Sequence, residues 1–144
     1  MSTGSTIDAG ALVANDSAIE HALCTFWIAG RLFGLDVGLV GEVVNVDAVL
    51  PVPASPPAVR GLVNLRGAPI VLLDTADVLG LDGGDGARPY ALVLAYADVV
   101  AALAVDRIDA VIAPGRLPTV DVTVLDAPLL VERIESLRIV RDAD

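Results

Sequence analysis

Residues 61–74 have the sequence Gly-Leu-Val-Asn-Leu-Arg-Gly-Ala-Pro-Ile-Val-Leu-Leu-Asp, and this stretch decides the expected fold. Two short apolar runs, 61–65 and 69–73, lie on either side of Arg66-Gly67-Ala68. Two strand-forming runs separated by a short segment that contains glycine are typical of a β-hairpin. The stretch therefore predicts two antiparallel strands joined by a tight turn.

A short helix is expected directly after this hairpin. Asp74 is a preferred capping residue, Asp77 follows three places later, and Gly80 ends the segment. Because aspartate accepts a hydrogen bond from the first helical turn and glycine ends many helices, residues 74–80 predict one or two helical turns. Before the hairpin, residues 51–57 hold four of the nine prolines and predict a stiff, extended connection.

Short runs of β-branched and apolar residues continue on both sides of this stretch. Strands are predicted at residues 25–28, 32–37, 40–49, 90–95, 99–105, 106–112, 120–125 and 128–131, and a closing helix at 132–137. Turn signals fall about every ten residues, which is the spacing found in small β-barrels and β-sandwiches. The sequence therefore predicts a mainly β fold with one or two short helices.

The two halves of the chain resemble each other in the spacing of their apolar residues. One constant offset aligns Leu35, Val37, Val40, Val43 and Val44 with Leu103, Val105, Ile108, Val111 and Ile112. A second, shorter offset aligns the segment 69–72 with 128–131. Halves of about 60 residues bury too little surface to be stable alone, so we expect two related β subdomains on a shared core, the second one abbreviated.

The expected domain organisation follows from these patterns. A flexible tail at residues 1–21 precedes a single domain at residues 22–144. Within that domain, a first subdomain at about 22–81 and a second at about 90–137 are separated by the glycine-rich linker 82–89, and a short tail ends the chain.

Composition and charge exclude several classes of protein. Of the 144 residues 55% are hydrophobic, and the formal charge is −10 because nine arginines and no lysine face nineteen acidic residues. The hydrophobic content excludes intrinsic disorder, and the acidic balance excludes nonspecific nucleic-acid binding. The most apolar run, residues 90–105, is shorter than a membrane span and contains Asp98, so it predicts buried core and not membrane insertion. The single cysteine, Cys24, permits no internal disulfide, and residues 1–10 lack a signal-peptide pattern, so a cytoplasmic location is expected.

Candidate catalytic and metal-ligating residues are scarce. The only histidine, His21, lies next to the tail. The acid pairs Asp74/Asp77 and Asp106/Asp109 are expected to cap a helix and to flank strand turns, not to perform acid–base chemistry. The sequence contains no nucleophile elbow, phosphate-binding loop or dinucleotide fingerprint. We therefore expect no catalytic residue, no metal site and no cofactor, and a function carried by a binding surface.

Five motifs lie in register between residues 23 and 112. They are Phe33-Gly34-Leu35-Asp36-Val37, Val40-Gly41-Glu42-Val43, Gly61-Leu62-Val63-Asn64-Leu65-Arg66-Gly67, Pro69-Ile70-Val71-Leu72-Leu73-Asp74, and residues 99–106 followed by Arg107-Ile108. With the proline-rich loop, this order resembles the signature of the CheW family, the coupling proteins of bacterial and archaeal chemotaxis. The sequence departs from the family pattern at Ala101-Ala102, where glycine is usual, and between residues 114 and 122, where the chain is shorter.

The resemblance implies a fold and a function. The fold is two small five-stranded SH3-like barrels packed on a shared hydrophobic core, here with an abbreviated second barrel. The function is that of a scaffold without enzymatic activity, which couples the cytoplasmic hairpin tip of a chemoreceptor to the regulatory domain of a CheA-type histidine kinase. The expected location is the cytoplasm, at membrane-anchored receptor arrays. The alternative is an orphan adaptor of the same fold in another two-component pathway, such as pilus motility or development.

The resemblance also indicates a partner-binding surface. Val40 and Glu42 match positions near the receptor-binding groove of the family, and Arg66 is expected to contact a partner or, alternatively, to pair with Glu42 or pin its own loop. Val40 fits the core equally well, and Asn64 is expected at the partner surface or in a hydrogen bond to the turn. The motif glycines Gly61 and Gly67 are expected to allow backbone angles or a close approach that a side chain would block.

Overall fold

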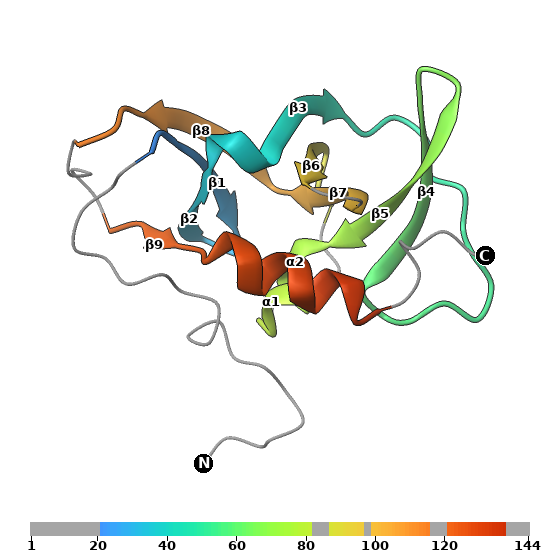
Figure 1. Ribbon diagram of the computed structural model, residues 1–144. Helices are drawn as coiled ribbons and strands as arrows, with labels where there is room; N and C mark the ends of the chain where they lie inside the picture. The colour runs from blue at the N-terminus through green and yellow to red at the C-terminus, as the bar shows by residue number, and fades with distance from the viewer. Residues whose placement is uncertain (1–20, 82–86, 97–98, 116–120, 138–144) are drawn as a thin grey trace, which may run out of the picture.

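A computed structural model describes residues 21–81, 87–96, 99–115 and 121–137, in which nine strands and two α-helices form (Figure 1). The strands are β1 (Leu23–Ile28), β2 (Arg31–Asp36), β3 (Val40–Asn45), β4 (Val59–Leu65), β5 (Ala68–Asp74), β6 (Tyr90–Tyr96), β7 (Val99–Val105), β8 (Arg107–Ile112) and β9 (Thr123–Val124), and the helices are α1 (Thr75–Leu79) and α2 (Ala127–Glu135). One turn of 3-10 helix, Val37–Leu39, connects β2 to β3. The expected mainly β fold is confirmed. The expected tail at residues 1–21 and much of the linker 82–89 lie outside the described residues.

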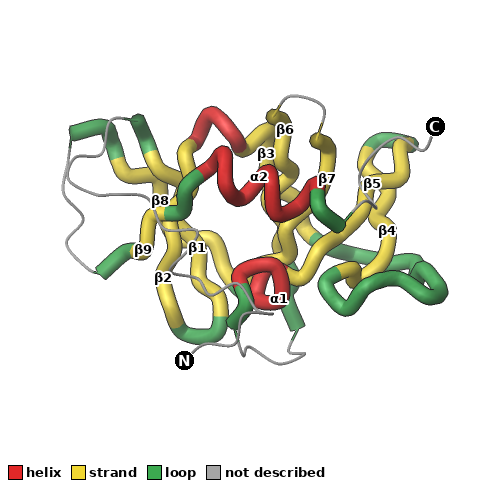
Figure 2. The backbone as a smooth tube through the Cα atoms, turned by 60° about the horizontal axis from the view of Figure 1, so that its bottom comes forward, coloured by secondary structure: helices red, strands yellow, loops and turns green. Residues whose placement is uncertain are grey.

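The strands form two sheets, and each sheet takes strands from both halves of the chain. One sheet has four strands in the order β8-β1-β2-β9, and the other has five in the order β3-β6-β7-β5-β4. Figure 2 shows the two groups of strands with α1 and α2 between them. Within the described residues, the smaller sheet has one strand fewer than the five that the resemblance implied. Strands from before and after the linker pair with each other, and the division into subdomains at about 22–81 and 90–137 stays a prediction.

One large core joins the two sheets, as expected. Phe26 and Phe33 of the four-stranded sheet are fully buried, and their stacked rings lie with centroids 6.1 Å apart. They share this core with Leu73 and Leu103 of the five-stranded sheet and with Leu130 of α2. Since side chains alternate along a strand, the opposite face of the five-stranded sheet carries a second, smaller cluster. That cluster consists of Ile70, Leu72, Ala91, Val93, Ala102 and Ala104.

The internal repeat that aligns Leu35 with Leu103 is confirmed by the strand register. Phe26 pairs with Phe33 and Ile108 in one sheet, and Leu94 pairs with Ala101 and Val40 in the other. The same offset relates position 26 to 94, 33 to 101, and 40 to 108. An irregularity of register also falls at the same point of both units. The strands β1-β2-β8 and β6-β7-β3 are therefore one repeated unit, in which β3 and β8 each join the sheet of the other half.

The second predicted offset, which aligned 69–72 with 128–131, is wrong. β5 pairs in parallel with β7, and β9 pairs in parallel with β2. Leu72 pairs with Ala102, and Val124 pairs with Gly34, which is the residue equivalent to Ala102 in the repeat. Val124 is therefore the counterpart of Leu72, whereas the predicted alignment had matched Leu72 with Val131. The sequence did not reveal the correct alignment of these segments, because both are apolar and aliphatic residues match at many offsets.

The predicted strand at 128–131 is also wrong, because these residues lie in α2. Asp126 caps the helix by accepting a hydrogen bond from the backbone N–H of Leu129 at 3.0 Å. Pro128 suits this first turn because the N–H that proline lacks would have no helical partner there. The predicted closing helix at 132–137 therefore begins earlier.

Two other strand predictions were too long. β3 ends at Asn45, whereas the valine-rich pattern predicted a strand as far as residue 49. Val46 still donates to the carbonyl of Pro89, the residue before β6, at 2.8 Å, and residues 46–49 are not in a strand. In the described residues, β9 covers Thr123–Val124 of the predicted strand 120–125.

Candidate partner-binding site

The β4–β5 hairpin ends in a tight turn that presents Arg66 to solvent. Leu65 pairs with Ala68, so Arg66 and Gly67 are the two central residues of the turn. Both have positive φ, 53° and 87°, which is the combination found in type I′ hairpin turns. Asn64 Oδ1 accepts a hydrogen bond from the backbone N–H of Gly67 at 2.7 Å, which confirms the expected bond to the turn. The side chain of Arg66 is 72% exposed.

Gly61 permits a close approach between β4 and the segment that follows β3. Its φ is 144°, and a Cβ at this position would lie 2.4 Å from the carbonyl oxygen of Leu50. Leu50 and Leu62 exchange two backbone hydrogen bonds here, of 2.9 and 2.8 Å. Gly67, by contrast, has no atom within 4 Å of the equivalent point and is required for its φ alone. Both glycines have the structural roles expected of them.

An ion pair in which one guanidinium nitrogen contacts both carboxylate oxygens joins Arg66 to Glu42 of β3. Nη2 of Arg66 lies 2.5 Å from Oε1 and 2.9 Å from Oε2 of Glu42. The hydrogen bond and the charge of Glu42 raise the pKa of Arg66, so the guanidinium group remains charged. The predicted alternative of pairing with Glu42 is therefore observed in the free chain. Arginine carries five N–H donors, and this pair engages one nitrogen, so the geometry allows a second acceptor from a partner.

This ion pair connects opposite edges of the five-stranded sheet. β3 and β4 are the first and last strands in its order, and the isolated backbone bridge joins Leu62 of β4 to Leu50 in the segment that follows β3. The sheet is therefore curled so that β4 approaches the β3 side at two places. One is this bridge to the segment after β3, and the other is the side-chain pair Arg66–Glu42.

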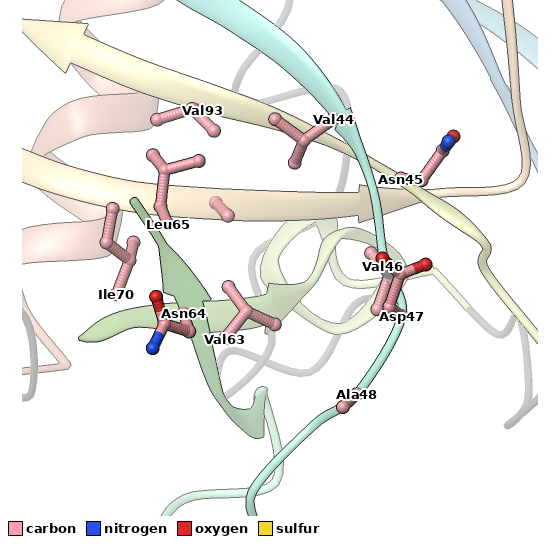
Figure 3. A pocket seen from close by; sticks show the side chains of 11 residues that line it. Val44, Asn45, Val46, Asp47, Ala48, Val63, Asn64, Leu65, Ile70 and Val93 are labelled. Atoms are coloured by element: carbon pink, nitrogen blue, oxygen red, sulfur yellow. The ribbon is translucent and has the colours of Figure 1, made fainter. Parts of the chain in front are cut away.

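An apolar pocket of about 190 Å³ lies along this seam (Figure 3). Most of its lining lies in sequence between the two connections, at residues 44–48 and 63–65, and Ile70, Val93 and Ala102 of the neighbouring strands complete it. The full lining is Val44, Asn45, Val46, Asp47, Ala48, Val63, Asn64, Leu65, Ile70, Val93 and Ala102. Ligand-binding clefts usually measure about 300–1,000 Å³, whereas an apolar cavity of about 150 Å³ holds one benzene ring. The pocket is therefore the size of a single inserted side chain.

The structure brings together three of the four predicted partner-binding residues. Arg66 contacts Glu42, and Asn64 lies on the same turn as Arg66 and lines the pocket. Val40 is different: it is partly buried and packs against the large core. The pocket residues Val44, Val63 and Leu65 were not singled out from the sequence, because their grouping depends on the curl of the sheet.

The acidic pairs have structural roles in the folded chain. Asp74 Oδ1 accepts from the backbone N–H of Ala76 at 3.0 Å and caps α1 as predicted. Asp109 lies within β8, not at a turn as expected, and accepts a hydrogen bond from Trp27 Nε1 at 3.3 Å. Across the described ranges, no group of three or more histidine, cysteine, aspartate and glutamate residues is placed to hold a metal ion.

The two other candidates for chemistry differ in exposure. His21 is exposed, and its Nδ1 lies 2.9 Å from Oδ2 of Asp36. Cys24 is buried on β1, and this burial raises the pKa of its thiol. A buried thiol with a raised pKa forms little of the reactive thiolate, so Cys24 is a small core residue. None of the helices in the described part of the chain is long and apolar enough to cross a membrane.

The fold and this surface define a β-rich domain with a candidate binding site on a curled sheet. The profile of the CheW-like domain matches residues 22–116, and the chain belongs to that family. It is 34% identical over 110 residues to the chemotaxis protein CheW of Treponema pallidum, covering 73% of this chain and 64% of that protein. It is 29% identical over 93 residues to the chemotaxis protein CheW of Thermotoga maritima, covering 65% of this chain and 62% of that protein. The chain thus spans less than two thirds of the length of both relatives.

A solved structure confirms the fold assignment. The crystal structure of the scaffolding protein TtCheW from Thermoanaerobacter tengcongensis superposes with a TM-score of 0.62 at 22% sequence identity. The similarity covers 74% of this chain and 89% of the other.

Proposed function

We propose that this protein is a non-enzymatic adaptor that couples a chemoreceptor to a CheA-type histidine kinase. The observation that carries the proposal is the Arg66 turn. A charged, exposed arginine is held in a left-handed conformation at a hairpin tip, beside a pocket that fits one apolar side chain. Arginine and apolar anchors are the groups that dominate binding energy at protein interfaces. The membership of the chain in the CheW-like family supports a chemoreceptor and a CheA-type kinase as the proposed partners.

The proposed partners have complementary chemistry. A receptor hairpin tip or a kinase regulatory domain would supply an acidic or carbonyl oxygen to Arg66 and an apolar side chain to the pocket. Glu42, whose side chain is 27% exposed, would then be released from Arg66 or shared with it. The proposed location is the cytoplasmic side of a membrane that carries the receptors.

An orphan adaptor in another two-component pathway is the second candidate. The observation that favours it is the short connection before β9: residues 113–122 lie between β8 and β9, whereas residues 46–67, including β4, lie between β3 and β5. The four-stranded sheet therefore offers a different surface from the five-stranded sheet. A shortened surface is compatible with a different second partner.

Complex formation with two partners tests the proposal. The purified chain is titrated by calorimetry with a cytoplasmic receptor fragment and with a kinase regulatory domain, and the three are then run together on a sizing column. We expect binding at tens of micromolar or tighter and one complex that contains all three. Absence of both interactions would overturn the adaptor proposal. Binding to neither of these partners but capture of a different receptor–kinase pair from the native cell would favour the second candidate.

A further inference from the structure

A partly buried ion network lies at a point where the two sheets are joined: Arg88 and Asp74 are buried, whereas Arg60 and Asp106 are partly exposed. The side chain of Arg88 is 2% exposed, and its guanidinium group contacts two carboxylates. Nε of Arg88 lies 3.4 Å from Oδ1 of Asp74, and Nη1 donates to Oδ1 of Asp106. From β4, Arg60 approaches the same Asp74, with Nη2 at 2.7 Å from Oδ2.

The residues of this network belong to different sheets. Asp74 ends β5 of the five-stranded sheet and caps α1. Asp106 stands between β7 and β8, so it is the single residue at which the chain leaves the five-stranded sheet and enters the four-stranded one. Its other oxygen, Oδ2, accepts a hydrogen bond from the backbone N–H of Ala29 at 2.8 Å, in the turn between β1 and β2. Arg88 thus bridges the end of β5 to a corner that is itself bonded to the opposite sheet.

The crossing at Asp106 differs from the equivalent crossing of the first repeat. Between β2 and β3 the chain passes through the helical turn Val37–Leu39, whose Leu39 is anchored in the large core. Between β7 and β8 no such turn intervenes. The corner at Asp106 is bonded to the four-stranded sheet, since its backbone N–H donates to the carbonyl of Trp27 at 3.0 Å, but this bond does not connect it to the five-stranded sheet. The ion network supplies directional contacts at this point.

Hydrophobic packing alone leaves this angle weakly specified, because apolar contacts are not directional. Buried ion pairs contribute little net stability, but in some proteins they select one arrangement among several that pack comparably. We propose that Arg88 is a positioning residue that sets the orientation of the four-stranded sheet relative to the five-stranded sheet. The proposal concerns the isolated chain and does not depend on the adaptor function.

The distance between the sheets tests this directly. Spin labels are placed at Val43 on β3 and Val111 on β8, which are exposed and occupy equivalent positions of the repeat. The native thiol is removed with Cys24→Ala, and the distance distribution is measured by pulsed electron resonance on the full chain. Arg88→Met is expected to broaden or shift the distribution, while Arg88→Lys, which keeps the charge but loses the fork, gives a smaller change.

Arg60→Met is the matched control, because Arg60 pairs with the same carboxylate from within the five-stranded sheet. We expect the Arg60 variant to keep the wild-type distance distribution. An unchanged distribution in Arg88→Met, or an equal broadening in Arg60→Met, would overturn the proposal. If Arg88→Met does not fold, Arg88→Lys is judged by the same comparison: a broadening absent from Arg60→Met supports the positioning role, and a wild-type distribution refutes it.

Discussion

Arg66 at the β4–β5 turn places its Nη2 2.5 Å from Oε1 of Glu42, at the opposite edge of the same sheet. The arginine side chain remains 72% exposed in this pair. Exposed ion pairs contribute little to stability, because water solvates the separated charges nearly as well. We therefore expect that the pair is not required for folding, which leaves Arg66 available for the proposed partner contact.

The first prediction follows from this exposure. Arg66→Ala and Glu42→Gln should both leave the midpoint of thermal unfolding unchanged within the scatter of repeated measurements. Circular dichroism at low and at physiological salt checks this, since screening weakens any exposed pair further. A clear fall of the midpoint in either variant would show that the pair holds the sheet edges together.

Gly61→Ala should destabilise the fold strongly. The added Cβ would lie 2.4 Å from the carbonyl oxygen of Leu50, and the φ of 144° is itself unfavourable for alanine. We expect a loss of about 2–4 kcal/mol in the free energy of unfolding, measured by urea titration.

Gly67→Ala is the control for this prediction, because it also has positive φ but meets no atom within 4 Å. It should cost only about 1–2 kcal/mol, the penalty of the left-handed conformation. Equal losses in the two variants would contradict the role assigned to the close contact with Leu50.

Asp126→Ala should weaken α2 by removing its N-cap. The carboxylate accepts a hydrogen bond from Leu129 at 3.0 Å, and loss of such a cap costs about 1 kcal/mol. Asp126→Asn keeps an oxygen acceptor and should stay within a few tenths of a kcal/mol of the wild type, by the same urea titration. If the alanine and asparagine variants were equally stable, the helix would not depend on this cap.

The titration of Asp77 should lower the free energy of unfolding as the pH rises through the acid range. Partial desolvation first, and the neighbouring Asp74 second, raise the pKa of Asp77, an exposed residue of α1, above its ordinary value of 3.8. The folded state therefore holds this proton more tightly than the unfolded state. The stabilisation of the folded state by this bound proton is complete below pH 3.8, and it is lost as the pH rises through the higher pKa of Asp77 in the folded state.

The Asp77→Asn variant isolates this effect from those of the other carboxylates. Its stability relative to the wild type should increase with pH above 3.8 and then level off toward neutrality. Urea titrations of both proteins across this range measure the difference. A difference that stays constant or decreases with pH would contradict the raised pKa.

The sequence predicted the repeated unit well, because strand periodicity and turn residues are local signals. The offset that aligns Leu35 with Leu103 also matches the register of Phe26–Phe33 with Leu94–Ala101. The hairpin around Arg66 and the cap at Asp74 followed from turn and capping chemistry. The strand prediction at 128–131 was wrong because a run of aliphatic residues occurs in strands and in helices alike. The signal that indicates a helix here is the N-cap residue Asp126.

The pairing of Arg66 with Glu42 was among the predicted alternatives, but other long-range contacts were not accessible from the sequence. The seam between β3 and β4, and with it the apolar pocket, exists because the five-stranded sheet curls until Leu50 meets Leu62. The contacts of Arg88 with Asp74 and Asp106 likewise depend on where two sheets meet. Such juxtapositions are set by tertiary packing, which composition and spacing do not encode locally.

The affinity of the Arg66→Ala variant is the sharpest test of the proposed partner-binding turn. Isothermal titration of the folded variant with the receptor fragment and the kinase regulatory domain is compared with that of the wild type, and Arg107→Ala on the four-stranded sheet serves as the control. We predict that Arg66→Ala weakens binding to at least one partner by about tenfold or more, which corresponds to about 1.4 kcal/mol, while the control binds like the wild type. Full retention of both affinities in Arg66→Ala would contradict the assignment of this turn as the partner-binding site.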